Sequence, residues 1–492
     1  MARTISVKPL RVILVFILGV AAGVPYNNSA QAAHAPPAPV TFALPPANSG
    51  SPFGSTAIDL PSKGYVEQEF LVSGSANRYR VKDPLKTAEL LDGGHAYTTR
   101  ILVRRPTDPT KFNGVVLVEW YNVTGQQDVD FVFGAIRNHL LERGYAWVGV
   151  SAQLAGVVAL KAKNPARYES LSLAASNVDP AGGMLDSTYG CGPCGPDAGD
   201  VLSWDVYTQI GEALRTPGTV DPLGGLKPKL IIATGESQSA SRLSKYYNSI
   251  LPFYPHVFDG FFLYDRLFEG AVRTDINAKL LSFGSEATRT LHGPPPPDSS
   301  NIRVWEVAGA SHLSLDELQS YMDEEHLRSG ITRHADGTPS TLSDVFAGFG
   351  CGNHPQLSRI PNGDALDAGL EALVIWVKEG KAPPTAPRLA ADAQGKLARD
   401  SEGRVSGGVR LAAYDAPIAK NLGDNSGPGA CVITGSHQDF TPAELCRRYG
   451  SPQNYVAKVT EVTRKAESDG FLVKADGDRT IQEARGVSFA CH

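Results

Sequence analysis

Short apolar runs alternate with amphipathic segments through the middle of the chain, and this alternation limits the folds that the chain can adopt. Residues 114–120 (GVVLVEW) and 145–153 (YAWVGVSAQ) are nearly continuous apolar runs, which is typical of strands buried on both faces. Between them, residues 130–144 have helical periodicity and end at a glycine, a common residue just beyond a helix C-terminus. A strand, a helix and a second strand in this order predict a βαβ unit.

The same order of elements continues toward the C-terminus. Two alternating, β-rich segments come first, at 65–74 and 97–106, and predict an antiparallel opening pair. We expect further strands and helices at 200–216, 229–235, 237–250, 257–265, 279–287, 302–309 and 364–380. Alternating strands and helices predict an α/β fold with a mostly parallel central sheet and helices on both faces.

The first residues have the layout of a secretory signal peptide. A positive start with Arg3, Lys8 and Arg11 precedes a short apolar stretch at 12–24, and residues 30–32 (AQA) offer a cleavage site. The apolar stretch is short for a membrane span, so an uncleaved anchor is the less favoured alternative. We therefore expect a periplasmic or secreted mature protein with no stable membrane anchor after cleavage.

Charge and cysteine content narrow the class of protein further. With a formal net charge of -5, the chain lacks the excess of basic residues that is typical of nucleic-acid-binding proteins, so we expect no nucleic-acid partner. Six cysteines in an exported chain favour disulfides, and Cys431 with Cys446 is the most plausible local pair, although sequence does not fix the connectivity. Cys191 and Cys194 form a CGPC motif, but its glycine- and proline-rich surroundings favour a structural bridge over a redox centre. We expect no metal ion, since no second Cys or His pair has ligand spacing.

The stretch ATGESQSASRL contains the strongest candidate for chemistry. A G-x-S-x-G turn between a strand and a helix exposes its serine above the sheet, and it needs small flanking residues because the turn is strained. Here the pentapeptide is Gly235-Glu236-Ser237-Gln238-Ser239, with a serine in place of the second glycine. Ser237 is therefore either a nucleophile or an ordinary helix N-cap.

Two further residues complete a candidate catalytic triad with Ser237. In hydrolases with this motif the chain order is serine, acid, histidine. His312 follows a predicted buried strand on a small-residue loop, where it could accept the serine proton. Glu286, in FGSEAT after the preceding strand, is the predicted acid, with Asp265 at the end of FFLYD as the alternative.

An oxyanion hole requires two backbone N–H groups directed at the developing charge. The residue after the nucleophile, Gln238, is expected to supply one. The second is expected from the loop EWYNVTGQQD, with Tyr121 or Asn122 as the donor. Asn122 also begins an NVT glycosylation sequon, which is a weak signal by itself.

At this point the sequence resembles the α/β-hydrolase superfamily, and within it a group of exported bacterial alpha/beta hydrolase domain proteins. The resemblance is carried by GYVEQEFLVSGSANRY, VLVEWYNVTG, GYAWVGVSAQ, ATGESQSASRL, VFDGFF, WEVAGASH and CVITGSHQDFTPAELCRRYG. It implies the α/β-hydrolase fold, Ser237 as nucleophile, His312 as base and no cofactor. It supports Glu286 as the acid only by position, and it supplies no substrate.

These observations together predict an exported serine hydrolase, most plausibly a carboxylesterase that acts on a small-molecule ester. A lactonase, thioesterase or peptidase with the same triad is an alternative, because substrate choice depends on the loops around the site. A non-catalytic binding protein that keeps the fold is another. We expect a signal peptide (1–32), a proline-rich lead (33–57), a catalytic domain (58–388) with long insertions (154–199 and 321–362), and a C-terminal extension packed on it (389–492).

Overall fold

A nine-stranded sheet forms the centre of the computed structural model, with strand order β1-β2-β3-β5-β4-β6-β7-β8-β9. The structure describes residues 36–186, 194, 198–266, 270–330, 333–334, 336–353 and 355–491, so the predicted signal peptide lies outside it. The strands are β1 (Thr41–Ala43), β2 (Tyr65–Arg80), β3 (Glu89–Pro106), β4 (Val115–Trp120), β5 (Ala146–Val150), β6 (Leu230–Glu236), β7 (Gly260–Tyr264), β8 (Lys279–Gly284) and β9 (Ile302–Glu306).

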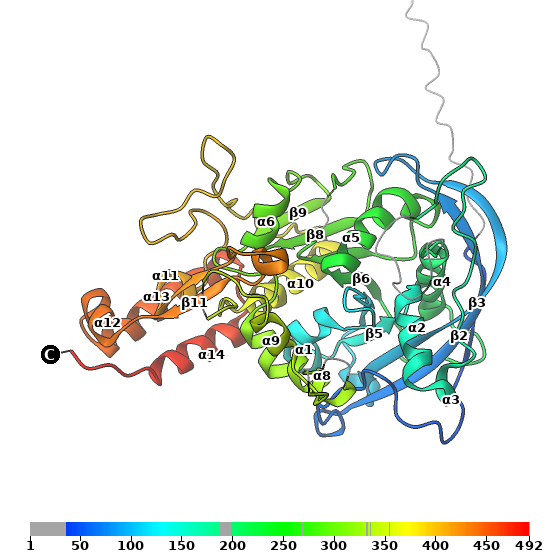
Figure 1. Cartoon of the computed structure of the whole chain (residues 1–492), viewed down its shortest axis with the longest axis horizontal. Helices are drawn as coiled ribbons and strands as arrows, with labels where there is room; N and C mark the ends of the chain where they lie inside the picture. The colour runs from blue at the N-terminus through cyan, green and yellow to red at the C-terminus, as the bar shows by residue number, and fades with distance from the viewer. Residues whose placement is uncertain are drawn as a thin grey trace, which may run out of the picture. The chain divides into compact units, whose positions relative to one another are not determined.

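The sheet is antiparallel at one edge and parallel elsewhere. β2 and β3 form the long, curved antiparallel pair drawn in blue in Figure 1, and β3 pairs antiparallel with β5. From β5 onward every neighbouring pair is parallel, and on β4 Val118 lies beside Val148 on one side and Ala233 on the other. The predicted opening pair and the predicted mostly parallel sheet are both confirmed.

Helices cover both faces of this sheet, because successive side chains of each strand point to opposite faces and are buried on both. On β4, Val116 and Val118 pack in the core that holds α4 (Ser203–Arg215) and α5 (Ser237–Lys245). Their neighbours Val115 and Leu117 point into the opposite core, with α1 (Phe131–Glu142) and α10 (Asn362–Glu379). The predicted covering of both faces of the sheet by helices is confirmed.

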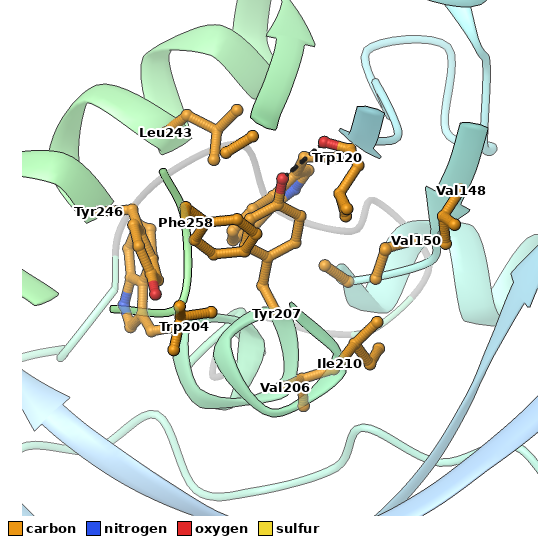
Figure 2. Packing of buried hydrophobic residues seen from close by; sticks show 14 of the residues in the cluster. Trp120, Val148, Val150, Trp204, Val206, Tyr207, Ile210, Leu243, Tyr246 and Phe258 are labelled. Carbon is orange, nitrogen blue, oxygen red and sulfur yellow. Dashed lines mark hydrogen bonds between the residues drawn. The ribbon is translucent and has the colours of Figure 1, made fainter. Parts of the chain in front are cut away.

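An aromatic cluster fixes α4 against the carboxyl end of β4 (Figure 2). The ring of Tyr207 lies 4.8 Å from that of Trp120 and stacks at 5.0 Å on Phe258. Its hydroxyl donates to the carbonyl of Val118 at 2.8 Å, so the one polar atom of this buried side chain is satisfied. The last residues of β4 are thereby held in place where the chain leaves the sheet.

The remaining described elements lie in the insertions, the connections and the C-terminal extension. Short helical elements are η1 (Pro61–Lys63), η2 (Pro109–Lys111), α2 (Leu154–Lys163), α3 (Pro165–Tyr168), η4 (Tyr246–Ile250), η5 (Leu251–Phe253), α6 (Glu286–His292), α7 (Leu315–Glu317), η6 (Leu318–Met322), α8 (Asp323–Ser329) and α9 (Leu342–Ala347). The extension contributes α11 (Ala412–Asp415), β10 (Ala419–Leu422), η7 (Gly429–Ile433), β11 (Ser436–Asp439), α12 (Pro442–Tyr449), α13 (Pro452–Asp469) and α14 (Lys474–Arg485). In the part of the chain that the structure describes, every helix is too short or too polar for a membrane span.

The C-terminal extension shares its core with the sheet. Val409 forms a parallel bridge with Val307, directly after β9, and the N–H of Ala308 donates to the Val409 carbonyl at 2.9 Å. Leu411 and Tyr414 belong to the same buried cluster as Trp305 of β9. Apolar contact with the end of β9 therefore anchors the extension next to the loop that follows this strand.

Two disulfides join Cys351 to Cys431 and Cys446 to Cys491, so the predicted Cys431–Cys446 pair is wrong. Between those two residues the chain forms β11, which pairs with β10, and Cys446 lies beyond it in α12. Sequence proximity therefore does not become proximity in space. Cys194 is also disulfide-bonded, whereas Cys191 lies outside the described residues.

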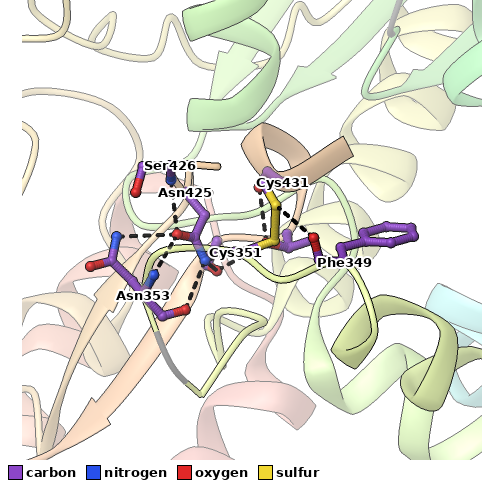
Figure 3. Close-up of a disulfide and its surroundings, with 8 residues drawn as sticks. Phe349, Cys351, Asn353, Asn425, Ser426 and Cys431 are labelled. Atoms are coloured by element: carbon purple, nitrogen blue, oxygen red, sulfur yellow. Dashed lines mark hydrogen bonds between the residues drawn. A yellow bond between two sulfur atoms is a disulfide. The ribbon is translucent and has the colours of Figure 1, made fainter. Parts of the chain in front are cut away.

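The Cys351–Cys431 disulfide attaches the second insertion to the extension (Figure 3). The N–H of Asn353 donates to the Asn425 side chain at 3.0 Å, and that side chain donates to the carbonyl of Gly435 at 2.7 Å. These contacts fix residues 425–435, which lie against the loop that carries His312.

The contact between α14 and α10 buries three carboxyl groups beside one guanidinium. Arg479 pairs with Asp364 and Asp476. Asp367, which is also buried, is hydrogen-bonded to Asp476. Burial, followed by the charges of Asp476 and Asp364, raises the pKa of Asp367 well above its ordinary value.

Asp367→Asn should make the protein more stable than the wild type at about pH 8. A carboxyl whose pKa is raised on folding contributes stability below its unfolded pKa, and that contribution is lost as the pH rises through the folded pKa. Each unit of pKa difference corresponds to about 1.4 kcal/mol. Asparagine removes the charge and keeps a donor for Asp476. The free energy of unfolding, measured from about pH 4 to about pH 8, should therefore fall less steeply with pH in Asp367→Asn than in the wild type. Asp469→Asn, an exposed exchange on α13, serves as control, and equal slopes in all three proteins would contradict the prediction.

Candidate active site

Ser237 occupies a strained turn between β6 and α5. It is the first residue of α5 and has a φ of 57°, in the left-handed region that few residues other than glycine adopt. The N-cap of α5 is Glu236, so the interpretation of Ser237 as an ordinary N-cap is wrong. A strained backbone at a nucleophile position is typical of the turn that exposes a serine above a parallel sheet.

Gly235 and Ser239, two residues before and after Ser237, are small, and at Gly235 the turn leaves no room for a larger residue. A Cβ on Gly235 would lie 2.8 Å from Oγ of Ser239 and 3.2 Å from the backbone nitrogen of Ala240. Ser239 replaces the second glycine of the motif and also stabilises the turn. Its hydroxyl accepts from the N–H of Glu236 at 3.0 Å and donates to the carbonyl of Glu236 at 2.8 Å.

His312 lies in the loop after β9, and the extension holds its backbone. Its N–H donates to the carbonyl of Ile433 at 3.2 Å, and its carbonyl accepts from the hydroxyl of Tyr264 at 3.3 Å. Its ring is buried, and Nδ1 lies 2.5 Å from Oδ2 of Asp265, which directly follows β7. Asp265 is therefore the carboxylate that orients the histidine ring.

Asp265 is held by groups at the start of α6. Its carboxylate accepts from the N–H and the hydroxyl of Ser285, both at 2.7 Å, and from the hydroxyl of Thr288 at 2.6 Å. Asp265 itself has a φ of 44°, so a second residue of the site adopts the left-handed region. These donors satisfy the carboxylate oxygens of Asp265 and fix them beside the histidine.

Glu286, the predicted acid, does not contact the His312 ring, and that prediction is wrong. Ser285 caps α6 and faces Asp265, so the next residue points to the other side, into the loop before His312. There the Glu286 carboxylate accepts from the N–H of Gly309 at 2.5 Å and from Arg399 at 2.9 Å. Burial raises the pKa of Glu286 to about 7, although Arg399 acts in the opposite direction. Glu286 thus stabilises the backbone of the loop that carries His312.

Glu236 is a site residue that the sequence analysis missed. Its Oε1 lies 3.0 Å from Nε2 of His312, and its Oε2 accepts from the side-chain amide of Asn122 at 2.9 Å. Burial would lower the pKa of His312, but the carboxylates of Glu236 and Asp265 on either side raise it to about 10. Among the described residues the hydroxyl of Ser237 makes no hydrogen bond to the ring of His312, whose Nε2 is paired with Glu236.

The predicted oxyanion donors differ in whether their backbone N–H groups are already engaged. Gln238 lies in the first turn of α5, where backbone N–H groups have no partner within the helix. The N–H of Tyr121 donates to Val150 at 3.3 Å, and that of Asn122 donates to Val129 at 3.1 Å. Both amides are already engaged, so the predicted second donor at 121–122 is wrong. Asn122 is also only 2% exposed, which removes the NVT sequon as a glycosylation site in the folded chain.

The described residues contain no set of three His, Cys, Asp or Glu side chains arranged to hold a metal ion.

The chain belongs to the family described as Alpha/beta hydrolase domain, whose model matches residues 35–482. No curated protein matches the sequence. Among solved structures, the esterase Est22 is 13% identical over 44% of this chain, with a TM-score of 0.24, and this chain spans about half of it (48%).

Two further structures show the same level of similarity. An α/β serine hydrolase homologue from Coxiella burnetii is 13% identical over 44% of this chain and 84% of its own, with a TM-score of 0.25. An α/β serine hydrolase without lid from Xanthomonas campestris is 12% identical over 49% of this chain and 85% of its own, with a TM-score of 0.24. At this distance the likeness carries no argument about substrate.

Gly235→Ala should destabilise the turn at Ser237, because the added methyl group meets both the hydroxyl of Ser239 and the backbone of α5. We expect a loss of about 1–3 kcal/mol in the free energy of unfolding, measured by thermal or urea denaturation. Gly125→Ala is the matched control in a nearby loop, since a Cβ there has no atom within 4 Å. Equal stability of the two variants would show that the turn is not tightly packed.

Proposed function

We propose that this chain is a serine hydrolase that cleaves a carboxylic ester of a small molecule, with Ser237 as nucleophile, His312 as base and Asp265 as the orienting acid. The observation that carries the proposal is the left-handed Ser237 at the start of α5, at the sheet edge where Asp265 holds the His312 ring. Membership of the α/β-hydrolase family supports it.

In the proposed reaction the hydroxyl of Ser237 attacks the ester carbonyl. Its proton passes to Nε2 of His312, while Asp265 accepts from Nδ1–H and stabilises the imidazolium. His312 then protonates the leaving alcohol, which leaves an acyl group on Ser237. Water, deprotonated by His312, hydrolyses the acyl-enzyme and regenerates the serine.

The oxyanion that forms at the carbonyl would lie at the N-terminus of α5. The N–H of Gln238 points out of the first helical turn, and the helix dipole favours negative charge there. The side chain of Gln238 donates to Gln153 at 3.0 Å, and the same oxygen of Gln153 accepts from the indole of Trp120 at 2.9 Å. These bonds fix the start of α5 against β4, so the donor is already oriented before a substrate binds.

We also propose that the protein is exported and works in the periplasm or outside the cell. Disulfides persist mainly in oxidising compartments, and Cys351–Cys431 and Cys446–Cys491 are both formed. The signal-like residues 1–32 support the same proposal.

A fluorophosphonate probe should label Ser237, because such probes react with serines that a nearby base activates. Mass spectrometry of the labelled, digested protein would locate the site. Labelling should disappear in Ser237→Ala and fall strongly in His312→Ala, whereas Ser244→Ala, on the same helix, should keep it. Absence of labelling in the wild type would favour a binding protein that keeps the fold, and labelling at another serine would remove Ser237 from the site.

Asp265→Asn should lower turnover of a model ester by about 10²–10⁴-fold, since the ring of His312 would lose both its orientation and the charge that stabilises the imidazolium. Glu286→Gln should lower it much less, because this carboxylate supports the loop and does not touch the ring. Steady-state kinetics with a p-nitrophenyl ester series would compare the two variants. A larger loss in Glu286→Gln would contradict the assignment of Asp265.

A further inference from the structure

The mechanism above leaves one buried carboxylate of the site without a role. Glu236 is 1% exposed, and its Oε1 faces Nε2 of His312 at 3.0 Å. Nε2 is the atom that has to accept the proton of Ser237. In this structure, therefore, a carboxyl group lies against the nitrogen that has to act as the base. Burial raises the pKa of Glu236, and the neighbouring His312 acts in the opposite direction by favouring the carboxylate.

A carboxylate in that position opposes the function of a base. An imidazole between two carboxylates is stabilised in its protonated form, because an opposite charge within about 4–6 Å favours the charged state. A protonated Nε2 has no lone pair and cannot take the serine proton. The free site should therefore hold an imidazolium between Asp265 and Glu236, and this imidazolium has to lose the Nε2 proton to solvent before the serine can react.

We propose that Glu236 is a residue of the catalytic machinery that keeps Nε2 of His312 protonated in the resting enzyme and so confines its activity to alkaline pH. This inference rests on the proposed function, because it concerns the same histidine. The proton that leaves Nε2 passes to solvent hydroxide or buffer base, and the ring is left neutral with Nδ1–H still bound to Asp265. No other bond forms or breaks in this step.

The surroundings of Glu236 fit this role. Asn122 donates to both Oε2 and the backbone carbonyl of Glu236, at 2.9 and 3.1 Å, which fixes the side chain with Oε1 toward the ring. Asp265 differs from Glu236 because Ser285 and Thr288 provide three donors to it. Asp265 is therefore held in place by donors other than the ring, whereas Oε1 of Glu236 lies against Nε2, the atom that exchanges the proton.

Other charged or titratable groups also lie near this pair. They are Asp265 and Arg266 after β7, Tyr264 of β7, Glu317 of α7 and His292 of α6. Burial lowers the pKa of His292, so this ring adds no positive charge at neutral pH. The carboxylate of Glu317 accepts from the hydroxyl of Tyr264 at 2.8 Å, and the same hydroxyl donates to the backbone carbonyl of His312. Glu317 is therefore linked to the backbone of the histidine loop and not to Nε2.

Glu236→Gln tests the proposal most directly. The amide keeps an acceptor for Asn122, removes the charge and presents a donor to a neutral Nε2. The rate at which a fluorophosphonate labels Ser237, measured against pH, needs no knowledge of the substrate. The acid limb of this profile should move to lower pH by about one to three units relative to the wild type. Glu236→Asp keeps the charge and should retain most of the alkaline profile.

Glu317→Gln is the matched control, since it removes another buried carboxylate of the site that does not contact the ring. Its acid limb should move much less than that of Glu236→Gln. NMR titration of the His312 ring gives an independent readout. In the wild type the ring should stay protonated above about pH 8, and in Glu236→Gln it should deprotonate at a lower pH.

The outcomes separate this inference from the proposed function. Coincident acid limbs in the wild type and Glu236→Gln, with Ser237 labelled in both, would overturn the role of Glu236 and leave the triad intact. Absence of labelling at every pH would overturn the proposed function. The ring titration would then still decide whether Glu236 keeps the His312 ring protonated, and an unchanged titration in Glu236→Gln would overturn that as well.

Discussion

The parallel register of β4, β6 and β7 is the constraint on which the site depends. Glu119 of β4 lies beside Thr234 of β6, and Glu236 of β6 lies beside Tyr264 of β7, so the three strands end at one edge of the sheet. The chain leaves this edge at Asn122, Ser237 and Asp265. The His312 ring, in the loop after β9, therefore meets Glu236 at the end of β6 and Asp265 directly after β7. Asn122, after β4, reaches the site through its bond to Glu236.

This arrangement costs free energy that neighbouring groups have to offset. Ser237 and Asp265 both adopt the left-handed region, at about 1–3 kcal/mol each. Asp265 is buried as well, but it accepts three hydrogen bonds besides that of His312, and bonds to a charged group contribute about 1.5–3 kcal/mol each. The donors at the start of α6 thus stabilise both an unfavourable backbone conformation and a buried charge.

The C-terminal extension is part of the construction of the site. Ile433 binds the N–H of His312, and Gly423 and Arg399 donate to Glu286, which in turn holds the N–H of Gly309. The Cys351–Cys431 disulfide fixes the segment that carries Ile433. The histidine loop is therefore held between β9 and a segment more than a hundred residues further along the chain. The family match, which extends to residue 482, includes this segment.

Much of this arrangement could be predicted from sequence, and the failures have physical causes. Apolar runs and helical periodicity locate the sheet and helices, and small residues around Ser237 mark the turn, because these depend on local patterns. The backbone amides of Tyr121 and Asn122 are predicted to be free, but they are bound by Val150 at the end of β5 and by Val129 further along the same loop, which folds back on itself. The disulfides differ from the prediction because Cys431 and Cys446 are close in sequence but not in space.

The acid is the more instructive failure. Counting strands from the motif favours Glu286, whereas the deciding feature is which side of α6 faces the histidine. Ser285 and Thr288 have the spacing of a helix N-cap and a residue of the first helical turn. Their hydroxyls point at the end of the neighbouring strand β7, and they indicate an acidic residue there as their acceptor. That signal was present in SEAT, directly after β8, and it indicates Asp265. Glu236 gave no such signal, because the motif leaves its position unspecified and only the path of β6 brings it to the histidine.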